Sequence, residues 1–475
     1  MAKEGKLLKH TVLIGASSAL CKAVSFFLLP LYTATLSPAE FGASDILVST
    51  AVLLLPLVSC NAPEAVFRFG AGEHAPSGVL AAGARCVGIG LFVFLLFLPL
   101  FGFSQVLRPY LLYLYLYVAA ANLHSLLAHA LRAAGEYGLY ALQQIFCALL
   151  TAVLGVLFLT VLRLGVRGYL ASVLVADLIT AIVLALCLRP WRLLQGNESR
   201  QGLARAMLRY SVPLIPASAL WWVIALSDRY ILLSFHGEVA TGIYAAAGRL
   251  PSLLTFALGI FMEAWQYAAI CEKNETRAVR FGKMYAMLLP FLVALCAALM
   301  LAARPLVWLI FDADYAAAAR DVPLLLLAGF FAALASFFGS VYTVKMHSGA
   351  VFWTTLGGAL LNLVLNFALI PRMGTTGAAL ATCFAYALVF VLRAWHTRAT
   401  MPFYRYAKKT AASALLLLFA ALLGARARLG PFAIGALLAP IPFWREGINL
   451  LAFLRKRLDG VLKKRKKARG DIDKA

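Results

Sequence analysis

Several basic residues lie inside long apolar stretches, where a charged side chain is costly and is therefore a candidate for function. Lys22 and Arg249 lie deep in such stretches with no acidic residue nearby in sequence, whereas Arg68 and Arg229 each have one close by. If these four cations converge on one cavity, they form a binding site for a phosphate or a diphosphate, because Arg offers a bidentate fork to phosphate oxygens. The alternative is that they pair with acidic side chains and only hold helices in register. Arg85, near the start of its stretch, is better explained by a side chain that reaches up to the membrane interface.

A second set of polar residues is suited to binding a small cation. Asn362 and Asn366 are four residues apart in an apolar stretch and share one helix face. Thr382 lies in the next stretch, beyond a Gly-rich bend. Together with Asp228, these side chains offer the oxygen ligands that a sodium ion requires. The alternative is that the asparagines only form hydrogen bonds between helices, as is common in membrane bundles.

The cysteine and histidine residues show no local motif for catalysis or metal binding. The eight cysteines are scattered singly and no C-x-x-C occurs, so the sequence indicates neither a zinc site nor a disulfide framework. The seven histidines form no H-x-x-x-H pair, since His124 and His129 are five apart. We therefore expect no metal centre apart from the sodium site, and no organic cofactor.

The elements that carry these residues are predicted to be membrane-spanning helices. Hydrophobic residues make up 63% of the 475-residue chain and charged residues 13%, which no ordinary soluble domain shows. A span requires roughly 20 apolar residues. About fourteen such stretches are predicted, with cores at 11–35, 44–62, 79–103, 109–131, 139–162, 168–188, 211–235, 241–269, 281–303, 322–343, 350–370, 376–397, 409–425 and 430–453. The predicted fold class is an all-α membrane protein.

The distribution of charge predicts how the chain is oriented. The net charge is +23, and most of the 43 basic residues fall in the two termini and in alternate loops. Because positive charge is retained in the cytoplasm, both termini are predicted to be cytoplasmic. The basic tail is expected to contact anionic headgroups of the membrane lipids. Since orientation explains the basic residues, no nucleic-acid partner is expected.

The second half of the sequence repeats the pattern of the first. Arg209–Val212 corresponds to Lys9–Val12, and Gly242 corresponds to Gly42 at the same separation of 200 residues. A duplication of this kind predicts two pseudo-symmetric lobes of six helices, followed by two further helices. The predicted divisions are an N-terminal lobe (1–195), a C-terminal lobe (196–400), two additional helices (401–455) and a basic cytoplasmic tail (456–475).

The sequence resembles the polysaccharide flippases of the multidrug/oligosaccharidyl-lipid/polysaccharide exporter superfamily, of the O-antigen and capsule repeat-unit type. The matching phrases follow one another along nearly the whole chain: SFFLLPLYTATLSPAEFGASDI, PEAVFRFG, SDRYILLSFHGEVATGIYAAAGRL, ADYAAAARDVPLLLLAGFF and ALLNLVLNFALIPRMGTTGAALAT. The resemblance implies a V-shaped bundle in which a lipid-linked oligosaccharide crosses a central cavity by alternating access.

The resemblance also implies roles for particular residues. Lipid II flippases of the superfamily have basic residues on helices 1, 2 and 8 in that cavity, and Lys22, Arg68 and Arg249 occupy comparable stretches here. That branch also has a sodium site made by an Asp on helix 7, two polar residues four apart on helix 11 and a Thr on helix 12. The matching residues are Asp228, Asn362, Asn366 and Thr382. The second helix-11 position is acidic in that branch and is an asparagine here, which puts the ion site in doubt.

Together these features predict a flippase of the bacterial inner membrane that translocates an undecaprenyl-pyrophosphate-linked oligosaccharide, with sodium or a proton as the coupling ion. Lys22, Arg249, Arg68 and Arg229 are the predicted substrate ligands. Polysaccharide polymerase and glycosyltransferases are the expected protein partners. The alternatives are an ion-coupled multidrug exporter of the same superfamily, which favours an acidic cavity, and a lipid II-type flippase. A membrane enzyme, such as a glycan polymerase, is disfavoured because the predicted external loops are too short to carry catalytic groups.

Overall fold

A computed structural model describes residues 2–70, 76–188, 201–254, 258–259, 262, 274–345, 348–398, 404–425 and 436–440. Throughout these residues the regular structure is helical. Eleven helices are long and apolar enough to cross a membrane, or up to twelve if a bent pair at Gly202–Leu214 and Ser218–Leu254 forms one span. The predicted fold class, an all-α membrane protein, is therefore confirmed. The predicted count of fourteen is not, because the predicted spans 241–269 and 430–453 fall partly outside the described residues.

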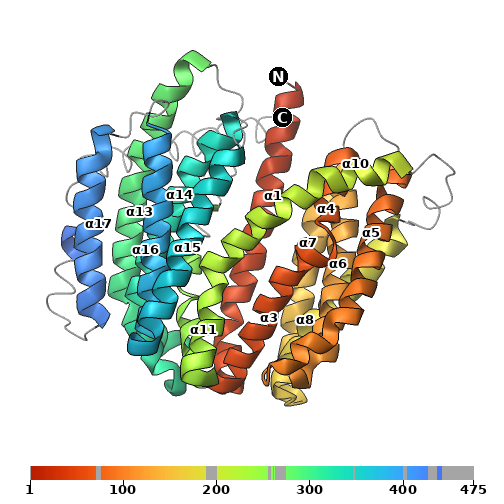
Figure 1. The fold of residues 1–475 in the computed structure, drawn as a ribbon, viewed down its shortest axis with the longest axis horizontal. Helices are drawn as coiled ribbons and strands as arrows, with labels where there is room; N and C mark the ends of the chain where they lie inside the picture. Colours follow the sequence, from red (N-terminus) through yellow and green to blue (C-terminus); the bar gives the residue numbers. More distant parts are fainter. Residues whose placement is uncertain are drawn as a thin grey trace, which may run out of the picture.

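The first half of the chain forms one group of helices (Figure 1). Its α-helices are α1 (Ala2–Phe27), α2 (Leu29–Thr35), α3 (Pro38–Val58), α4 (Ala62–Gly70), α5 (Pro76–Phe97), α6 (Leu111–Ala133), α7 (Tyr137–Val156) and α8 (Gly165–Leu188). Short 3₁₀ turns cover Leu98–Phe103 and Arg108–Tyr110, and a π-helical turn, Leu157–Val161, ends α7. We call this group the first lobe.

The second half forms the other group, which lies on the left of Figure 1. Its elements are α11 (Ile215–Ala247), α13 (Asn274–Ile310), the 3₁₀ helix η5 (Ala313–Arg320), α14 (Val322–Lys345), α15 (Ser348–Met373), α16 (Thr375–His396) and α17 (Tyr404–Ala425). We call α11 to α16 the second lobe. The predicted boundaries at 195, 400 and 455 fall in segments outside the described residues and stay predictions.

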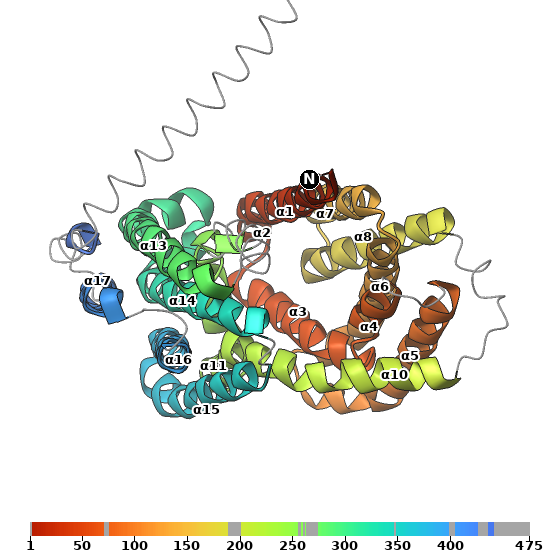
Figure 2. The same cartoon turned by 90° about the horizontal axis from the view of Figure 1, so that it is seen from above.

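A short helix, α10 (Gln201–Ser211), precedes the second lobe but lies over the first, as Figure 2 shows. Its apolar face is buried against α4 and α5, where Met207 packs with Val66 and Leu80. Its opposite face carries the exposed Arg205 and Arg209. Because the segregation of apolar and basic residues is complete, α10 is suited to lie at the level of lipid headgroups.

The outward faces of the membrane helices are apolar. Large hydrophobic side chains such as Phe92 and Leu96 on α5 and Trp353 and Phe367 on α15 are more than half exposed. In water such a surface would drive aggregation, whereas lipid tails solvate it at no cost. The structure therefore belongs to a multi-pass membrane protein.

The two lobes meet where α3 crosses α11. Ser37 starts α3 with a capping box, in which its hydroxyl accepts from the Glu40 backbone N–H and Glu40 accepts from the Ser37 backbone. On the facing helix, Gly237 has a φ of 78° and bends α11. Glycine adopts this left-handed conformation without a steric penalty. Both helices therefore change direction beside the crossing, at the end of the bundle remote from the N-terminus (Figure 1).

Only glycine fits at the crossing itself. A methyl group built on Gly42 would lie 2.8 Å from the Gly242 nitrogen and would overlap the Glu238 carbonyl oxygen. A methyl group built on Gly242 would overlap the Pro38 carbonyl oxygen. The contact is reciprocal, since each partner in α11 stands 200 residues after its counterpart in α3. A two-fold axis through the crossing produces such a contact, which supports the duplication predicted from the sequence.

Candidate functional site

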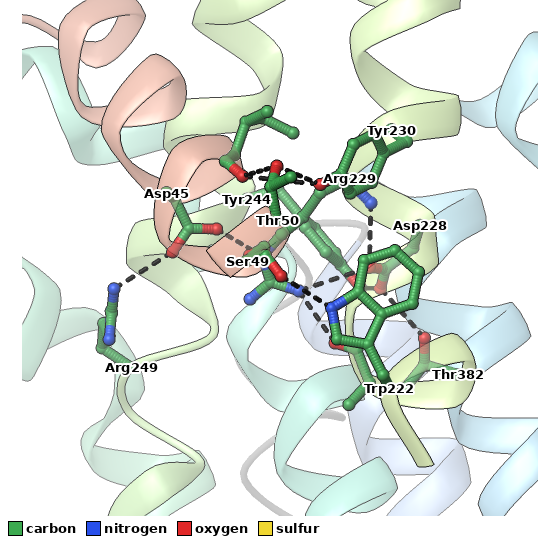
Figure 3. A network of polar contacts seen from close by, with 12 residues as sticks. Asp45, Ser49, Thr50, Trp222, Asp228, Arg229, Tyr230, Tyr244, Arg249 and Thr382 are labelled. Atoms are coloured by element: carbon green, nitrogen blue, oxygen red, sulfur yellow. Dashed lines mark hydrogen bonds and ion pairs between the residues drawn. The ribbon is translucent and has the colours of Figure 1, made fainter. Parts of the chain in front are cut away.

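A network of charged and polar side chains joins the lobes beside the glycine crossing (Figure 3). Its centre is Asp45 on α3, whose side chain is only 7% exposed. One carboxylate oxygen accepts a hydrogen bond from Arg229 Nε, and the other accepts from Arg249 Nη2 at 3.0 Å. The first lobe thus supplies one acid, and the second lobe supplies two guanidinium groups that converge on it.

Asp45 is the residue that the sequence analysis missed. It lies within the quoted phrase SPAEFGASDI, eight residues after the helix cap. The available signal was its position as the only acid in α3 beyond the first turn, in a helix that is otherwise apolar. Its partners are 184 and 204 residues away in sequence, so no local spacing rule predicts the pairing.

A second carboxylate, Asp228, lies on the other side of Arg229. Its side chain is 1% exposed, and its Oδ1 accepts from the Arg229 backbone N–H at 2.9 Å and from Nη1 at 3.3 Å. Its Oδ2 accepts from the Tyr244 hydroxyl at 2.6 Å and from Thr382 Oγ1 at 3.2 Å. Adjacent residues on a helix do not ordinarily face each other, so we expected none of this pairing from the sequence; the long Arg229 side chain folds back to reach its neighbour. Two acids and two guanidinium groups make the network electrically neutral.

The predicted cation ligands form two contacting pairs, Asp228 with Thr382 and Asn362 with Asn366, which Ser227 beside Asp228 connects. Asp228 contacts Thr382, and its neighbour Ser227 donates to Asn362 Oδ1 at 3.2 Å. Asn366 Nδ2 donates to the same oxygen at 3.0 Å. Asn362 and Asn366 are both fully buried, and Asn366 Oδ1 has no hydrogen-bond partner.

These residues fit a sodium ion in part. A buried acceptor without a donor, such as Asn366 Oδ1, is satisfied when a cation binds beside it. The negative charge of Asp228, however, is already compensated by Arg229, which lowers its value as a cation ligand. The asparagine pair and Thr382 supply neutral oxygens only, so the sodium site stays a prediction.

A single substitution tests the charge argument. Asn366→Asp is expected to raise the affinity for sodium at least about tenfold, or about 1.4 kcal/mol, because a second carboxylate then faces the site. The measurement is binding of ²²Na⁺ to the purified protein. Asn122→Asp is the matched control, since Asn122 is a buried asparagine on α6 that bonds only within its own helix. Unchanged sodium affinity in Asn366→Asp would refute the site.

The predicted substrate cations differ in their surroundings. Arg249 keeps 42% of its side chain exposed although it pairs with Asp45, whereas Arg229 is buried between its two carboxylates. Lys22 on α1 is exposed, and a methyl group on Gly259 would come within 3.7 Å of its Nζ. Lys22 of the first lobe therefore reaches across to the segment that follows Arg249 in the second.

Arg68 lies elsewhere, on the exposed side of α4. Its suggested partner Glu64 instead faces His129, with 3.6 Å between Nε2 and Oε1. The neighbouring His129 lowers the pKa of the Glu64 carboxyl, although partial burial opposes the shift. The structure thus brings Arg229 and Arg249 to one acid and places Lys22 at the lobe boundary, while Arg68 is exposed on α4 and takes no part in this network among the residues that the structure describes.

Further hydrogen bonds hold the lobes together on either side of this network. Along α3, the Trp222 indole N–H donates to the Ser49 carbonyl at 2.8 Å, and the hydroxyls of Thr50 and Tyr230 are 2.6 Å apart. Beyond the crossing, the Tyr315 hydroxyl of η5 donates to the Leu36 carbonyl at 2.8 Å. The lobes are thus tied at the end of the bundle that is remote from the N-terminus.

Comparison with known sequences identifies the family. A family model described as polysaccharide biosynthesis protein matches residues 7–266, which is more than half of the chain. The chain belongs to the polysaccharide biosynthesis protein family. A comparison of the sequence with curated proteins finds no match.

Solved structures show how far the fold of this family member is shared. It is similar to a structure described as lipid II flippase MurJ in the inward closed conformation, with a TM-score of 0.71 over 95% of this chain and 99% of that chain at 14% identity. It is also similar to multidrug resistance MATE family transporters of the MOP superfamily. The inward-facing form has a TM-score of 0.63 at 14% identity, over 80% of this chain and 95% of that chain. The outward-facing form has a TM-score of 0.59 at 16% identity, over 82% of this chain and 95% of that chain. The chain is thus a member of the polysaccharide biosynthesis protein family whose fold is shared with membrane transporters of this superfamily, in line with the resemblance.

Proposed function

We propose that the protein is a flippase that moves an undecaprenyl-pyrophosphate-linked oligosaccharide from the cytoplasmic to the outer leaflet of the bacterial inner membrane. The family assignment supports a polysaccharide pathway, and the fold supports a flippase or exporter. Both termini are cytoplasmic in this proposal, so the glycine crossing closes the external side. The structure then corresponds to an inward-facing state, ready to receive substrate from the cytoplasmic leaflet.

The observation that carries the proposal is the half-exposed guanidinium of Arg249 at the boundary between the lobes. In this state its charge is balanced by the single carboxylate of Asp45. A diphosphate offers more negative charge and a bidentate oxygen pair, so it competes with Asp45 for Arg249. Substrate binding thereby loosens the ion pair that closes the lobes, which couples recognition to opening.

Lys22 completes the recognition in this mechanism. It comes from the other lobe and is exposed toward the segment that includes Gly259. A diphosphate held by Lys22 and Arg249 is bound by both lobes at once, as an alternating-access site requires. Arg229 stays with its two acids until Asp45 is released. Arg68 contacts the substrate at a separate point on its route. Glycosyltransferases supply the glycan on the cytoplasmic side of the membrane, and polysaccharide polymerase uses it on the outer side. Sodium or a proton remains the proposed coupling ion.

Neutralising the two exposed cations tests the proposal. Lys22→Gln and Arg249→Gln are each expected to reduce flipping at least about tenfold, because each loses a charge-assisted contact worth about 1.5–3 kcal/mol. Translocation is measured in vesicles that contain the purified protein and a fluorescent lipid-linked oligosaccharide. Arg85→Gln is the matched control: Arg85 is an exposed arginine on α5 and should be replaced without loss. Full activity in both test variants would overturn the assignment.

Transport assays in the same vesicles distinguish the proposed function from the two alternatives, a lipid II-type flippase and a multidrug exporter. A lipid II-type flippase translocates labelled lipid II, and a multidrug exporter moves a hydrophobic cationic dye. The basic character of Lys22 and Arg249 favours an anionic substrate over a cationic one. We expect transport of the lipid-linked oligosaccharide and none of the dye.

A further inference from the structure

A compact cluster of metal-ligating side chains lies within the first lobe, on helices other than α3. His124 comes from α6, Cys147 from α7 and Asp177 from α8, and their ligand atoms all lie within 4.8 Å of one another. The side chains of His124 and Asp177 are 15% and 14% exposed, so the cluster is largely buried. Three packed helices thus present a ring nitrogen, a sulfur and a carboxylate oxygen to one point.

The hydrogen bonds of His124 define which atom it presents. Gln143, one turn before Cys147 on α7, places its Oε1 2.6 Å from His124 Nε2. An amide oxygen only accepts, so the ring donates its Nε2–H. A neutral imidazole then turns the lone pair of Nδ1 toward Asp177 Oδ1, which is 2.6 Å away. Two electron-rich atoms at this distance require a cation, either a proton or a metal ion, between or beside them.

We infer that this cluster is a binding site for a divalent transition metal of the zinc class, ligated by His124 Nδ1, Cys147 Sγ and Asp177 Oδ1. Imidazole, thiolate and carboxylate are the three ligand types that zinc uses in proteins. A metal-ligating histidine usually donates a hydrogen bond from its second ring nitrogen, which fixes its tautomer. Here Gln143 Oε1 accepts that hydrogen bond from His124 Nε2. A fourth position is left for water, as in zinc sites with three protein ligands.

Both distances to the Asp177 carboxylate are compatible with a tetrahedral ion after a small adjustment, and the ring nitrogen and the sulfur lie within 4.8 Å of each other. Cys147 Sγ lies 3.5 Å from Asp177 Oδ1. This is the separation expected when sulfur and oxygen bind one zinc ion at about 2.3 Å and 2.0 Å with a tetrahedral angle between the two bonds. The distance from His124 Nδ1 to Asp177 Oδ1 must lengthen by less than about 1 Å from its hydrogen-bonded value for both atoms to bind the same tetrahedral ion. Binding releases the thiol proton of Cys147 and the proton held between Nδ1 and Oδ1, both to solvent.

Charge balance is compatible with a dication at this position. A buried carboxylate inside a membrane lobe is costly unless a positive charge accompanies it. Zinc with one thiolate and one carboxylate carries no net charge, so the filled site suits the apolar interior of the lobe. Bound metal ties α6, α7 and α8 together and is expected to stabilise the first lobe.

Cobalt is the probe that tests the site directly. The full-length protein, freed of its affinity tag and of metal by EDTA, is titrated with Co²⁺ in detergent. We expect binding of about one equivalent, a near-ultraviolet thiolate-to-cobalt absorption band and displacement of that band by Zn²⁺. Zn²⁺ should also raise the thermal unfolding midpoint by at least about 2 °C.

Variants assign the signal to the cluster. Cys147→Ser should lose the absorption band while its unfolding midpoint in EDTA stays near that of the native protein. Cys86→Ser, which changes another half-buried cysteine of the same lobe on α5, should keep the band. Should Cys147→Ser fail to fold, Asp177→Asn serves instead, with metal affinity expected to fall at least about tenfold. No band in the native protein, or a band that persists in Cys147→Ser, overturns the proposal and leaves a proton as the cation of the cluster.

Discussion

Gly242→Val is expected to abolish oligosaccharide flipping by this protein while leaving the amount inserted in the membrane within about twofold of the native level. Even a methyl group at this position would overlap the Pro38 carbonyl oxygen of α3. The clashing atom belongs to the backbone, so it cannot move aside by a change of side-chain rotamer. The lobes must therefore separate at the crossing before the side chain fits.

The effect falls on one conformation of the transporter. Overpacking costs about 1–3 kcal/mol in a soluble core, and here it applies only to the state in which α3 and α11 are in contact. A penalty of about 2–3 kcal/mol on that state shifts the equilibrium between closed and open forms roughly 30- to 150-fold. Because alternating access requires both states in every cycle, a population shift of this size stops turnover even though each lobe remains folded.

Two measurements separate this mechanism from simple misfolding. One is translocation in vesicles; the other is the rate at which a membrane-impermeant maleimide labels Ser44→Cys, placed in a background without the eight native cysteines. Ser44 is buried in α3 beside the crossing, so labelling from outside should be faster in Gly242→Val. Gly88→Val on α5 is the matched control, because a side chain built on Gly88 meets nothing within 4 Å. Normal flipping in Gly242→Val would show that the lobes tolerate separation and that the crossing is no gate.

The repeat in the sequence predicts two related lobes but not the contact between them. The repeat that pairs Gly42 with Gly242 is visible as a constant offset, and a two-fold arrangement converts that offset into a contact. The resemblance likewise grouped Asp228 with Asn362, Asn366 and Thr382; the structure brings Thr382 to Asp228, and Asn362 to its neighbour Ser227. Helical spacing and family position indicate which helix faces meet, whereas the sodium site itself stays a prediction.

The ion pairs could not be predicted in this way. Arg249 has no acidic residue near it in sequence, and its partner Asp45 lies in the other lobe. The His124 cluster escaped notice for the same reason, since the sequence search sought local metal motifs whereas its ligands come from three separate helices. Contacts that depend on the crossing of distant helices require coordinates.

Asp45→Asn is expected to open the external side as strongly as the glycine variant does, by electrostatics instead of by steric overlap. Removing one partner of a fully buried ion pair costs about 3–5 kcal/mol, and the cost here is smaller because Arg249 is 42% exposed and water screens its charge. Arg229 keeps Asp228, but Arg249 loses the carboxylate that holds it across the lobe boundary. Labelling of Ser44→Cys should therefore accelerate and flipping should fall at least about tenfold. Asp314→Asn, which changes an exposed carboxylate of η5, should alter neither.

A double-mutant cycle distinguishes the closing role of Arg249 from its proposed contact with substrate. If Asp45 and Arg249 act as a pair, Asp45→Asn combined with Arg249→Gln should accelerate labelling no more than Asp45→Asn alone, because the double variant has no orphaned charge on Arg249. The labelling is measured without substrate, so the loss of diphosphate binding does not contribute. Additive effects of the two substitutions would mean that the ion pair does not close the lobes. A coupling of about 1 kcal/mol or more would instead establish Asp45 as the partner of Arg249 in the empty transporter. The contact of Arg249 with a diphosphate is then tested separately, by the flipping assay on Arg249→Gln.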